Sequence, residues 1–318
     1  MATVWIHAGL TEAGPEPVTF ELLSAARSLG GTVEVVAFGP GASATGEDFG
    51  AHGASRVFAC DEDAGPRAAA RTLERLIHEH GPDLVLFATS YGGRDVAARL
   101  QARTGSTLMS NATAVTTFDR ARTEILGGTR IVDVQLAGPT PRLVLMKPRS
   151  AEAQATADGP AAEVVRVDTE PSADLREPRL LSRQAQTSRG PSLDDARVVV
   201  AGGRGLGSAE GFAMLEALAG TIEGAAVGAS RAAVDAGWRP YASQIGQTGR
   251  TVKPDVYLAM GISGALQHVV GMKGSRRVIA VNKDADAPIM RLADLGVVGD
   301  LAEVVPALTE EIRRRTGS

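Results

Sequence analysis

The clearest signal of the fold is one short stretch, VYLAMGISGALQH, at residues 256–268. Its first five residues, Val256–Met260, are a continuous apolar run of the length that predicts a buried β-strand. The chain then turns at Gly261, and residues 264–271 predict a helix. Ser263 is expected to cap this helix, because a serine hydroxyl accepts a hydrogen bond from the first helical turn. Free N–H groups at a helix start favour an anion such as pyrophosphate.

The same stretch has a simpler interpretation. Short turns of glycine and serine between a strand and a capped helix are common, so the pattern alone does not establish a phosphate site. Gly261 and Gly264 favour a ligand, since glycine lets the backbone approach one closely. The glycines from Gly203 to Gly207 match the dinucleotide fingerprint poorly, because Ser208 occupies the position of its third glycine.

The same alternation of strand and helix extends over the last third of the chain. Further strands are predicted at 197–201, 225–228, 278–281 and 296–298, and helices at 208–219, near 232 and from 301 to about 315. In an open parallel sheet, ligands bind outside the carboxyl ends of the strands. The predicted ends carry polar side chains that could line a crevice of cofactor size: Arg204, Ser230, Arg231, Asn282 and Asp300.

The first part of the chain predicts a second α/β unit. Strands are expected at 4–8, 33–38, 57–59 and 83–88, with helices at 17–29, 66–80 and 92–103. Runs at 112–118, 130–136 and 142–146 follow without helices between them, and we expect these as antiparallel strands added to the first sheet. The fold class is therefore α/β with two domains, an N-terminal mixed sheet with helices and a C-terminal parallel sheet.

A change in composition predicts the domain boundary. Proline, serine, arginine and glutamine interrupt the pattern between residues 170 and 195, so we expect an N-terminal domain at 1–189 and a C-terminal domain at 190–318. The N-terminal domain is expected to contact a partner.

Composition argues against several classes of protein. The net charge of −4 is unlike that of a general nucleic-acid binder. Cys60 is the single cysteine, so no intrachain disulfide is possible, and we expect no metal site. No apolar run reaches the roughly 18 residues of a membrane span, so we expect a protein of the bacterial cytoplasm rather than an integral membrane protein.

Several motifs in the last third resemble the alpha subunit of the electron-transfer flavoprotein family. The similarity is dense and in order from about residue 197 to 306, whereas the first domain matches the family only in outline. The chain departs little from the pattern, for example at Leu295, where tyrosine is usual. The motifs are VGASRAAVD (227–235), GQTG (246–249), GISGALQH (261–268), GM (271–272), VNKD (281–284), API (287–289) and GDL (299–301).

This resemblance implies one FAD, held mainly by the C-terminal domain. The Thr248 hydroxyl would lie near the flavin N5, Arg231 would stack near the flavin ring, and Asn282 and Asp300 would reach the adenosine end. Arg231 and His268 are the expected positive charges beside the flavin. The full set of cofactor-binding residues that the resemblance implies is Arg204, Ser230, Arg231, Ile245, Gly246, Gln247, Thr248, Ser263, Gly264, Ala265, Leu266, Gln267, His268, Asn282, Asp300 and Leu301.

The resemblance also implies a heterodimer with a beta subunit and the role of an electron carrier rather than an enzyme. Electrons would come from flavoprotein dehydrogenases, such as the acyl-CoA dehydrogenases of fatty acid beta-oxidation, and pass to a quinone oxidoreductase or another acceptor. No convincing nucleophile–base pair is found among the histidines, so we expect no catalytic residues. Two alternatives remain open: an electron-bifurcating member with a second flavin in the partner, and a flavin-dependent oxidoreductase with its own substrate.

Overall fold

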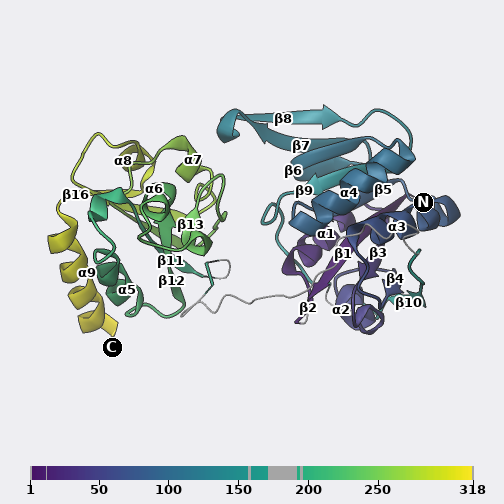
Figure 1. Cartoon of the computed structure of the whole chain (residues 1–318), viewed down its shortest axis with the longest axis horizontal. Coiled ribbons are helices and arrows are strands. Elements are labelled where there is room, and N and C mark those ends of the chain that lie inside the picture. Colours follow the sequence, from purple (N-terminus) through teal and green to yellow (C-terminus); the bar gives the residue numbers. More distant parts are fainter. Residues whose placement is uncertain (1, 12, 157–158, 171–191, 194–195, 317–318) are drawn as a thin grey trace. The chain divides into compact units, whose positions relative to one another are not determined.

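The computed structural model describes residues 2–11, 13–156, 159–170, 192–193 and 196–316. The chain forms two compact units, residues 1–183 and 184–318, and each is described by itself (Figure 1). The domain boundary expected between residues 189 and 190 lies outside the described residues.

The N-terminal unit is built on a ten-stranded mixed sheet in the order β10-β4-β3-β1-β5-β9-β6-β7-β8, with β2 paired to β1. Its strands are β1 (Thr3–Thr11), β2 (Gly14–Pro15), β3 (Thr32–Phe38), β4 (Arg56–Cys60), β5 (Leu84–Ala88), β6 (Leu108–Thr117), β7 (Arg120–Ile125), β8 (Arg130–Gln135), β9 (Arg142–Met146) and β10 (Glu163–Arg166). Its helices are α1 (Pro17–Arg27), α2 (Gly46–Gly50), α3 (Pro66–His80) and α4 (Tyr91–Thr104), with 3-10 turns η1 (Ala42–Ala44) and η2 (Leu126–Gly128).

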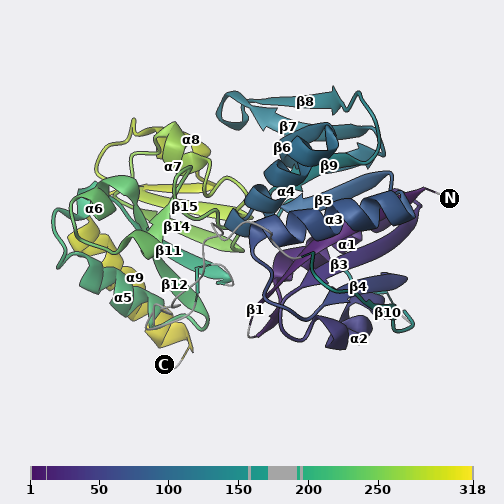
Figure 2. The ribbon, with the colours of Figure 1, turned by 45° about the vertical axis from the view of Figure 1, so that its right-hand side comes forward.

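Helices cover both faces of this sheet, as the alternation of strand and helix predicts. One core cluster joins alternate β1 residues such as Ile6 to Leu22 and Leu23 of α1. The opposite cluster joins Trp5 to Leu73 of α3 and Leu100 of α4. Figure 2 shows α3 and α4 lying along the sheet.

The prediction for the last strands of this unit was partly wrong. Strands β6, β7 and β8 do form an antiparallel meander, although β7 was not predicted. In contrast, β9 pairs in parallel with both β5 and β6 and lies inside the sheet. Its sequence, RLVLM, is buried on both faces, which is the environment of a parallel strand.

The C-terminal unit is a six-stranded sheet in the order β13-β12-β11-β14-β15-β16, and every pairing in it is parallel. Its strands are β11 (Val198–Gly202), β12 (Ala225–Ser230), β13 (Gln244–Ile245), β14 (Val256–Met260), β15 (Arg277–Asn282) and β16 (Leu295–Val298). Its helices are α5 (Phe212–Ala219), α6 (Arg231–Asp235), α7 (Leu266–Val269), α8 (Pro288–Leu292) and α9 (Leu301–Thr316), with 3-10 turns η3 (Arg204–Leu206) and η4 (Tyr241–Ser243).

The two faces of this second sheet are covered differently. Helices α5 and α9 pack on one face through Phe212, Leu215 and Val305. Shorter segments cover the other face, where Ile262 and Ile289 pack against Tyr257 and its neighbours. The predicted α/β fold class, with a mixed and a parallel sheet, is confirmed.

The described residues were also compared with the features of membrane-spanning and metal-binding proteins. No helix among the described residues is long and apolar enough to cross a membrane. The same residues contain no cluster of three or more His, Cys, Asp or Glu side chains that could hold a metal ion.

Candidate functional site

A cavity of about 560 Å³ lies at the carboxyl edge of the C-terminal sheet. Its walls come from the segments that follow β11, β12, β13, β14 and β15. The strand order reverses between β11 and β14, because the chain adds β12 on one side of β11 and β14 on the other. Ligands of open parallel sheets bind at such a reversal, and the volume is typical of a small-molecule site.

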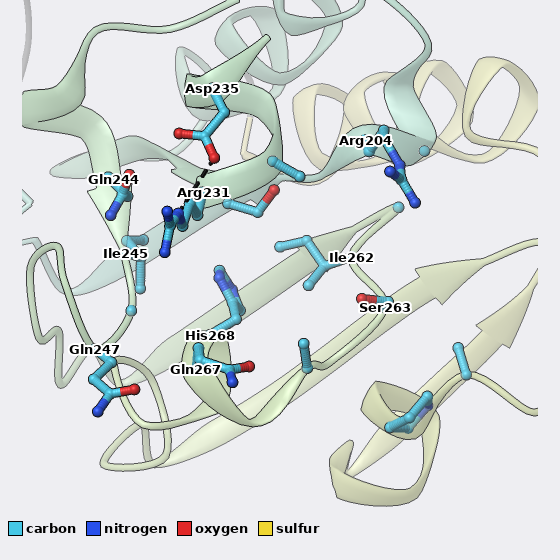
Figure 3. A pocket seen from close by; sticks show the side chains of 18 of the residues that line it. Arg204, Arg231, Asp235, Gln244, Ile245, Gln247, Ile262, Ser263, Gln267 and His268 are labelled. Carbon is cyan, nitrogen blue, oxygen red and sulfur yellow. Dashed lines mark hydrogen bonds and ion pairs between the residues drawn. The ribbon is translucent and has the colours of Figure 1, made fainter. Parts of the chain in front are cut away.

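The cavity brings together most of the cofactor-binding residues expected from the sequence. Figure 3 shows several of them around the opening, among them Arg204, Arg231, Gln247 and His268. The expected residues that line the cavity are Arg204, Ser230, Arg231, Ile245, Gly246, Gln247, Thr248, Ser263, Ala265, Gln267, His268 and Asn282.

Four expected residues do not line the cavity: Gly264, Leu266, Asp300 and Leu301. Asp300 caps α9 by accepting a hydrogen bond from the Ala302 N–H at 2.9 Å. This bond, together with the Lys283 ammonium 3.0 Å away, lowers the pKa of the Asp300 carboxyl. Leu301, the first residue of α9, is buried in the core. Asp300 and Leu301 therefore each have a structural role in α9.

The turn after β14 differs from its prediction. Helix α7 starts only at Leu266, with Ala265 before it, and Ser263 makes no capping hydrogen bond. As a result, the backbone N–H groups of residues 263–266 donate to no group in the described part of the chain. Because successive N–H groups without acceptors attract anions, a phosphate site at this turn stays a prediction, through its loop rather than through a helix start.

Gly264 is required for the packing of this turn. Its φ of +82° lies in the left-handed region, and an added Cβ would collide with the backbone of Ile289. The Ile289 N–H also donates to the Ser263 carbonyl at 3.1 Å. That Gly264 also lets the backbone approach a ligand stays a prediction.

Close contacts between loops hold the edge together. The N–H of Gly203 donates to the Met260 carbonyl at 2.9 Å, and the N–H of Gly205 donates to the Gly261 carbonyl at 3.0 Å. Side chains at Gly203 or Gly205 would strike the Gly261 backbone. These glycines, which matched a nucleotide fingerprint poorly, thus allow close contact between the loop after β11 and the loop after β14.

The Asn282 side chain ties two other segments. Its Nδ2 donates to the Ile262 carbonyl at 3.0 Å, and its Oδ1 accepts from the Asp284 N–H at 3.1 Å. Asn282 therefore fixes the position of the turn after β14 relative to the segment after β15, in addition to lining the cavity.

Thr248 is held by two hydrogen bonds from its own loop. The Gln244 Nε2 donates to the Thr248 Oγ1 at 2.9 Å, and the Tyr241 hydroxyl donates to the Thr248 carbonyl. Since Oγ1 already accepts from an amide, its own hydrogen is available to donate to another group. Gln244 is buried and lines the cavity.

Arg231 carries the charge expected of it, but it has a counter-ion. Its Nε lies 3.2 Å from the Asp235 Oδ2, four residues later on α6, and Asp235 also lines the cavity. The two side chains are 66% and 63% exposed, so their mutual attraction is weak in the isolated chain. Ser230 caps the same helix by accepting from the Ala233 N–H at 3.4 Å.

His268 does not supply the positive charge expected of it. Burial lowers the pKa of its imidazole to about 4, so the ring is neutral near pH 7. Its Nε2 lies 2.8 Å from the Tyr257 hydroxyl. The backbone of Ile245 is near enough to oppose the pKa shift weakly. It does not form a well-directed hydrogen bond, because the buried Nδ1 has no partner in the described part of the chain.

Sequence reasoning missed some residues of this site. Gln244 lies on the two-residue strand β13, which is too short to leave a hydrophobic pattern. Asp235 could have been found from its spacing, because residues four apart on a helix are neighbours. The other lining residues outside the expected set are Gly205, Ala232, Gly261, Ile262, Asp284, Ala287 and Pro288.

Comparison with known proteins gives a consistent result for both units. Residues 192–273 match the family described as the electron transfer flavoprotein FAD-binding domain, and residues 4–172 match the electron transfer flavoprotein domain. The chain is 41% identical to the electron transfer flavoprotein subunit alpha of Mycobacterium leprae, over 100% of both chains. It is 42% identical to that of Mycobacterium tuberculosis CDC 1551, again over 100% of both. It is 37% identical to that of Syntrophomonas wolfei, over 99% of this chain and 100% of the relative.

The buried, neutral His268 predicts a dependence of stability on pH. Its pKa is about 4 in the folded chain and near 6.5 when unfolded, so between these values the unfolded state binds more protons. Stability should therefore fall as pH falls, with His268 accounting for about 2 kcal/mol of the loss between pH 7.5 and 5. His268→Gln should remove that share of the loss.

This is measured by urea unfolding at the two pH values. The two tryptophans lie in different units, so a Trp5→Phe background leaves Trp238 as the reporter for the C-terminal unit. The control is His78→Gln, which removes an exposed histidine of α3 and should leave the pH dependence unchanged. An equal pH dependence in wild type and His268→Gln would contradict the assignment.

Proposed function

The chain belongs to the electron transfer flavoprotein family, as an alpha subunit, and on that premise we propose that it carries electrons as half of a heterodimer with a beta subunit. It would accept them from flavoprotein dehydrogenases, such as acyl-CoA dehydrogenases, and pass them to a quinone oxidoreductase or another acceptor. Its C-terminal unit is the FAD-binding domain of the family. FAD supplies the redox chemistry, while the protein supplies binding, orientation and electrostatics.

The main support for this proposal comes from the turn after β14. Four successive backbone N–H groups, from Ser263 to Leu266, lack acceptors among the described residues, and the turn borders the cavity. A pyrophosphate needs donors of this kind, and neutral backbone donors leave no net positive charge when the ligand departs. We propose that this turn binds the FAD pyrophosphate.

The Thr248 side of the cavity suits the flavin ring. The Thr248 hydroxyl has a hydrogen free to donate, because its oxygen accepts from Gln244. The same cavity is also lined by the apolar residue Ile245. A ring with both polar edges and apolar faces requires such a combination of groups. We propose that Thr248 donates to a ring nitrogen and that Arg231 lies over the ring.

The exposure of the cavity supports the need for a partner. Much of its lining is exposed in the chain by itself, including Arg231, Gln247, Thr248, Ser263 and Gln267. Electrostatic interactions with a redox group are strengthened when water is excluded. We propose that the beta subunit covers this side of the cavity.

The side chains of the cavity support a carrier rather than an enzyme with its own substrate. Among the described residues that line it, Asp235 is paired with Arg231, and Ser230 caps α6. His268 is neutral and bonded to Tyr257. None of these contacts joins a nucleophile to a base, which an acid–base mechanism would need.

The proposal is tested by co-expressing the chain with the beta subunit encoded beside it and measuring the absorption spectrum and flavin content. We expect one FAD per heterodimer, reduction by a flavoprotein dehydrogenase, and little flavin on the chain alone. Two flavins per heterodimer would favour the electron-bifurcating alternative. Turnover of NADH or a small substrate by the heterodimer alone would contradict the role of a carrier.

The proposed pyrophosphate site predicts different effects for two changes at one position. Ser263→Pro removes a backbone N–H from the turn, so the heterodimer should lose most of its FAD. Ser263→Ala removes only the hydroxyl, so it should keep FAD near the wild-type level. Flavin content is measured after acid release, and Trp238 fluorescence checks that both variants fold. Wild-type flavin content in Ser263→Pro would rule out this turn.

The Arg231–Asp235 pair predicts shifts of opposite sign in the reduction potential of bound FAD. Electrons add negative charge, so Arg231→Ala should lower the potential of a one-electron step and Asp235→Asn should raise it, each by about 40 mV for a change of about 1 kcal/mol. Arg231→Lys should fall between wild type and Arg231→Ala, because it keeps the charge without the planar group.

Potentiometric titration of the heterodimers measures these shifts. A second ion pair of the same unit, Arg197 with Asp255, joins the starts of β11 and β14 at the opposite edge of the sheet. Arg197→Ala and Asp255→Asn make the same charge changes and should leave the potential unchanged. Unaltered potentials in both Arg231→Ala and Asp235→Asn would show that this pair does not tune the flavin.

A further inference from the structure

A buried glutamine supports Thr248 at the edge of the cavity. The Gln244 Nε2 on β13 donates to the Thr248 Oγ1 at 2.9 Å. Gln244 is 3% exposed, whereas Thr248 is an exposed residue, and both line the cavity. Figure 3 shows Gln244 near Ile245 and Arg231. The amide therefore holds the threonine from its buried side.

Packing alone does not require an amide at this position. In the sheet register, Gln244 lies opposite Ala229 of β12, and the next residue, Ile245, belongs to an apolar core. A methionine has a side chain of similar length, and it would not lose the hydration that an amide loses on burial. Among the described residues, Thr248 is the hydrogen-bond partner of the Gln244 amide nitrogen. The bond to Thr248 is therefore the specific contribution of the glutamine.

The backbone of the loop after β13 brings these two side chains together. The Arg250 N–H donates to the Gln244 carbonyl at 2.7 Å, and the Gly249 N–H donates to the Gly246 carbonyl at 3.1 Å. A side chain at Gly249 would collide with the Gln244 carbonyl. The loop therefore folds back tightly on the strand before it, which places Thr248 against the Gln244 side chain.

The bond from Gln244 decides what the Thr248 hydroxyl can offer to a ligand. A hydroxyl has one hydrogen and two lone pairs, and the amide occupies one of the lone pairs. Because the amide nitrogen is a donor, the hydroxyl hydrogen cannot point toward it. Within the described residues, this hydroxyl donates to no other group. Its hydrogen is therefore directed away from the buried side of Thr248.

We infer that Gln244 is a positioning residue: its amide fixes the Thr248 hydroxyl as a hydrogen-bond donor toward the cavity. Accepting a hydrogen bond also polarises the hydroxyl and strengthens the bond that it donates. The inference rests on the proposed function in that the group which takes this bond would be the ring of FAD. A hydrogen bond to the ring becomes stronger when the ring gains negative charge, so the donor favours the addition of an electron.

The first test examines the hydrogen bond in the chain without flavin. The full-length chain is labelled with ¹⁵N-glutamine, and Gln244→Met identifies the side-chain amide signals of Gln244. Thr248→Val removes the acceptor, so these signals should shift and their hydrogens should exchange faster with water. Thr248→Ser keeps the hydroxyl and should leave the signals near their wild-type positions. Amide signals that do not respond to Thr248→Val would overturn the inference.

The second test measures the potential of the first one-electron step of FAD in the heterodimer. Gln244→Met leaves the Thr248 hydroxyl free to rotate, so the ratio of affinities for reduced and oxidised FAD in this step should fall three- to tenfold. This corresponds to a potential lower by about 30–60 mV. In a Thr248→Val background, Gln244→Met should cause no further shift, because its effect passes through the hydroxyl.

Two control variants separate positioning from a loss of stability. Tyr241→Phe removes the hydroxyl that donates to the Thr248 carbonyl, so it weakens the same loop while the Thr248 Oγ1 keeps its donor. Thr309→Val removes a buried hydroxyl that donates to the Val305 carbonyl at 2.7 Å within α9. Both should lower stability without the shift in potential that Gln244→Met causes.

The outcomes distinguish this inference from the proposed function. FAD bound with an unchanged potential in Gln244→Met would overturn the positioning role alone. An equal shift in Tyr241→Phe, or in the Thr248→Val background, would also overturn it. If the heterodimer binds no FAD, the proposed function fails, while the amide signals still decide whether Gln244 holds the Thr248 hydroxyl.

Discussion

The reversal of strand order between β11 and β14 is the constraint on which the site depends. Because every strand of this sheet is parallel, all the carboxyl ends meet at one edge. The chain leaves β11 toward β12 and later returns to β14 on the other side, so the connections diverge at the centre of that edge. The resulting space is the cavity of about 560 Å³. The polar side chains around it are neighbours only because the strands before them are aligned.

The glycines at this edge have two distinct roles. Gly203 and Gly205 lie against the Gly261 backbone, so the loops after β11 and β14 can form hydrogen bonds directly to each other. Gly264, with its positive φ, lets the following turn pass the Ile289 backbone. These close contacts hold the segment after Ile262 in place, while its N–H groups donate to no acceptor in the described part of the chain. Tight packing of one segment therefore leaves the donors of the next available to a ligand.

Two side chains of the cavity that were expected to be positive charges beside the flavin are paired or neutral. Arg231 has Asp235 as a counter-ion, and burial lowers the pKa of His268, so that its ring is neutral near pH 7. An electron carrier must release electrons as well as accept them, so an unopposed positive charge beside its cofactor would favour the reduced state too strongly. A neutral histidine and an arginine paired with a carboxylate are compatible with reversible transfer.

The sequence by itself determined most of the strands, the parallel sheet of the last third and the motifs that identify the family and its FAD-binding domain, because these are local patterns. It also located most of the cavity's lining, since most motif residues lie in the segments that follow the strands. The short strand β13 and the parallel placement of β9 were not predictable, because both depend on which distant strand is the neighbour.

Only the tertiary structure decided the state of individual groups. It moved the start of α7 beyond Ser263, placed Asp300 at a helix cap, and buried His268 beside Tyr257, eleven residues earlier in the chain. The same histidine would be charged or neutral according to how much water reaches it, and burial is a property of the whole packed unit. A sequence motif names the residues of a site, while packing sets their charge and their hydrogen-bond partners.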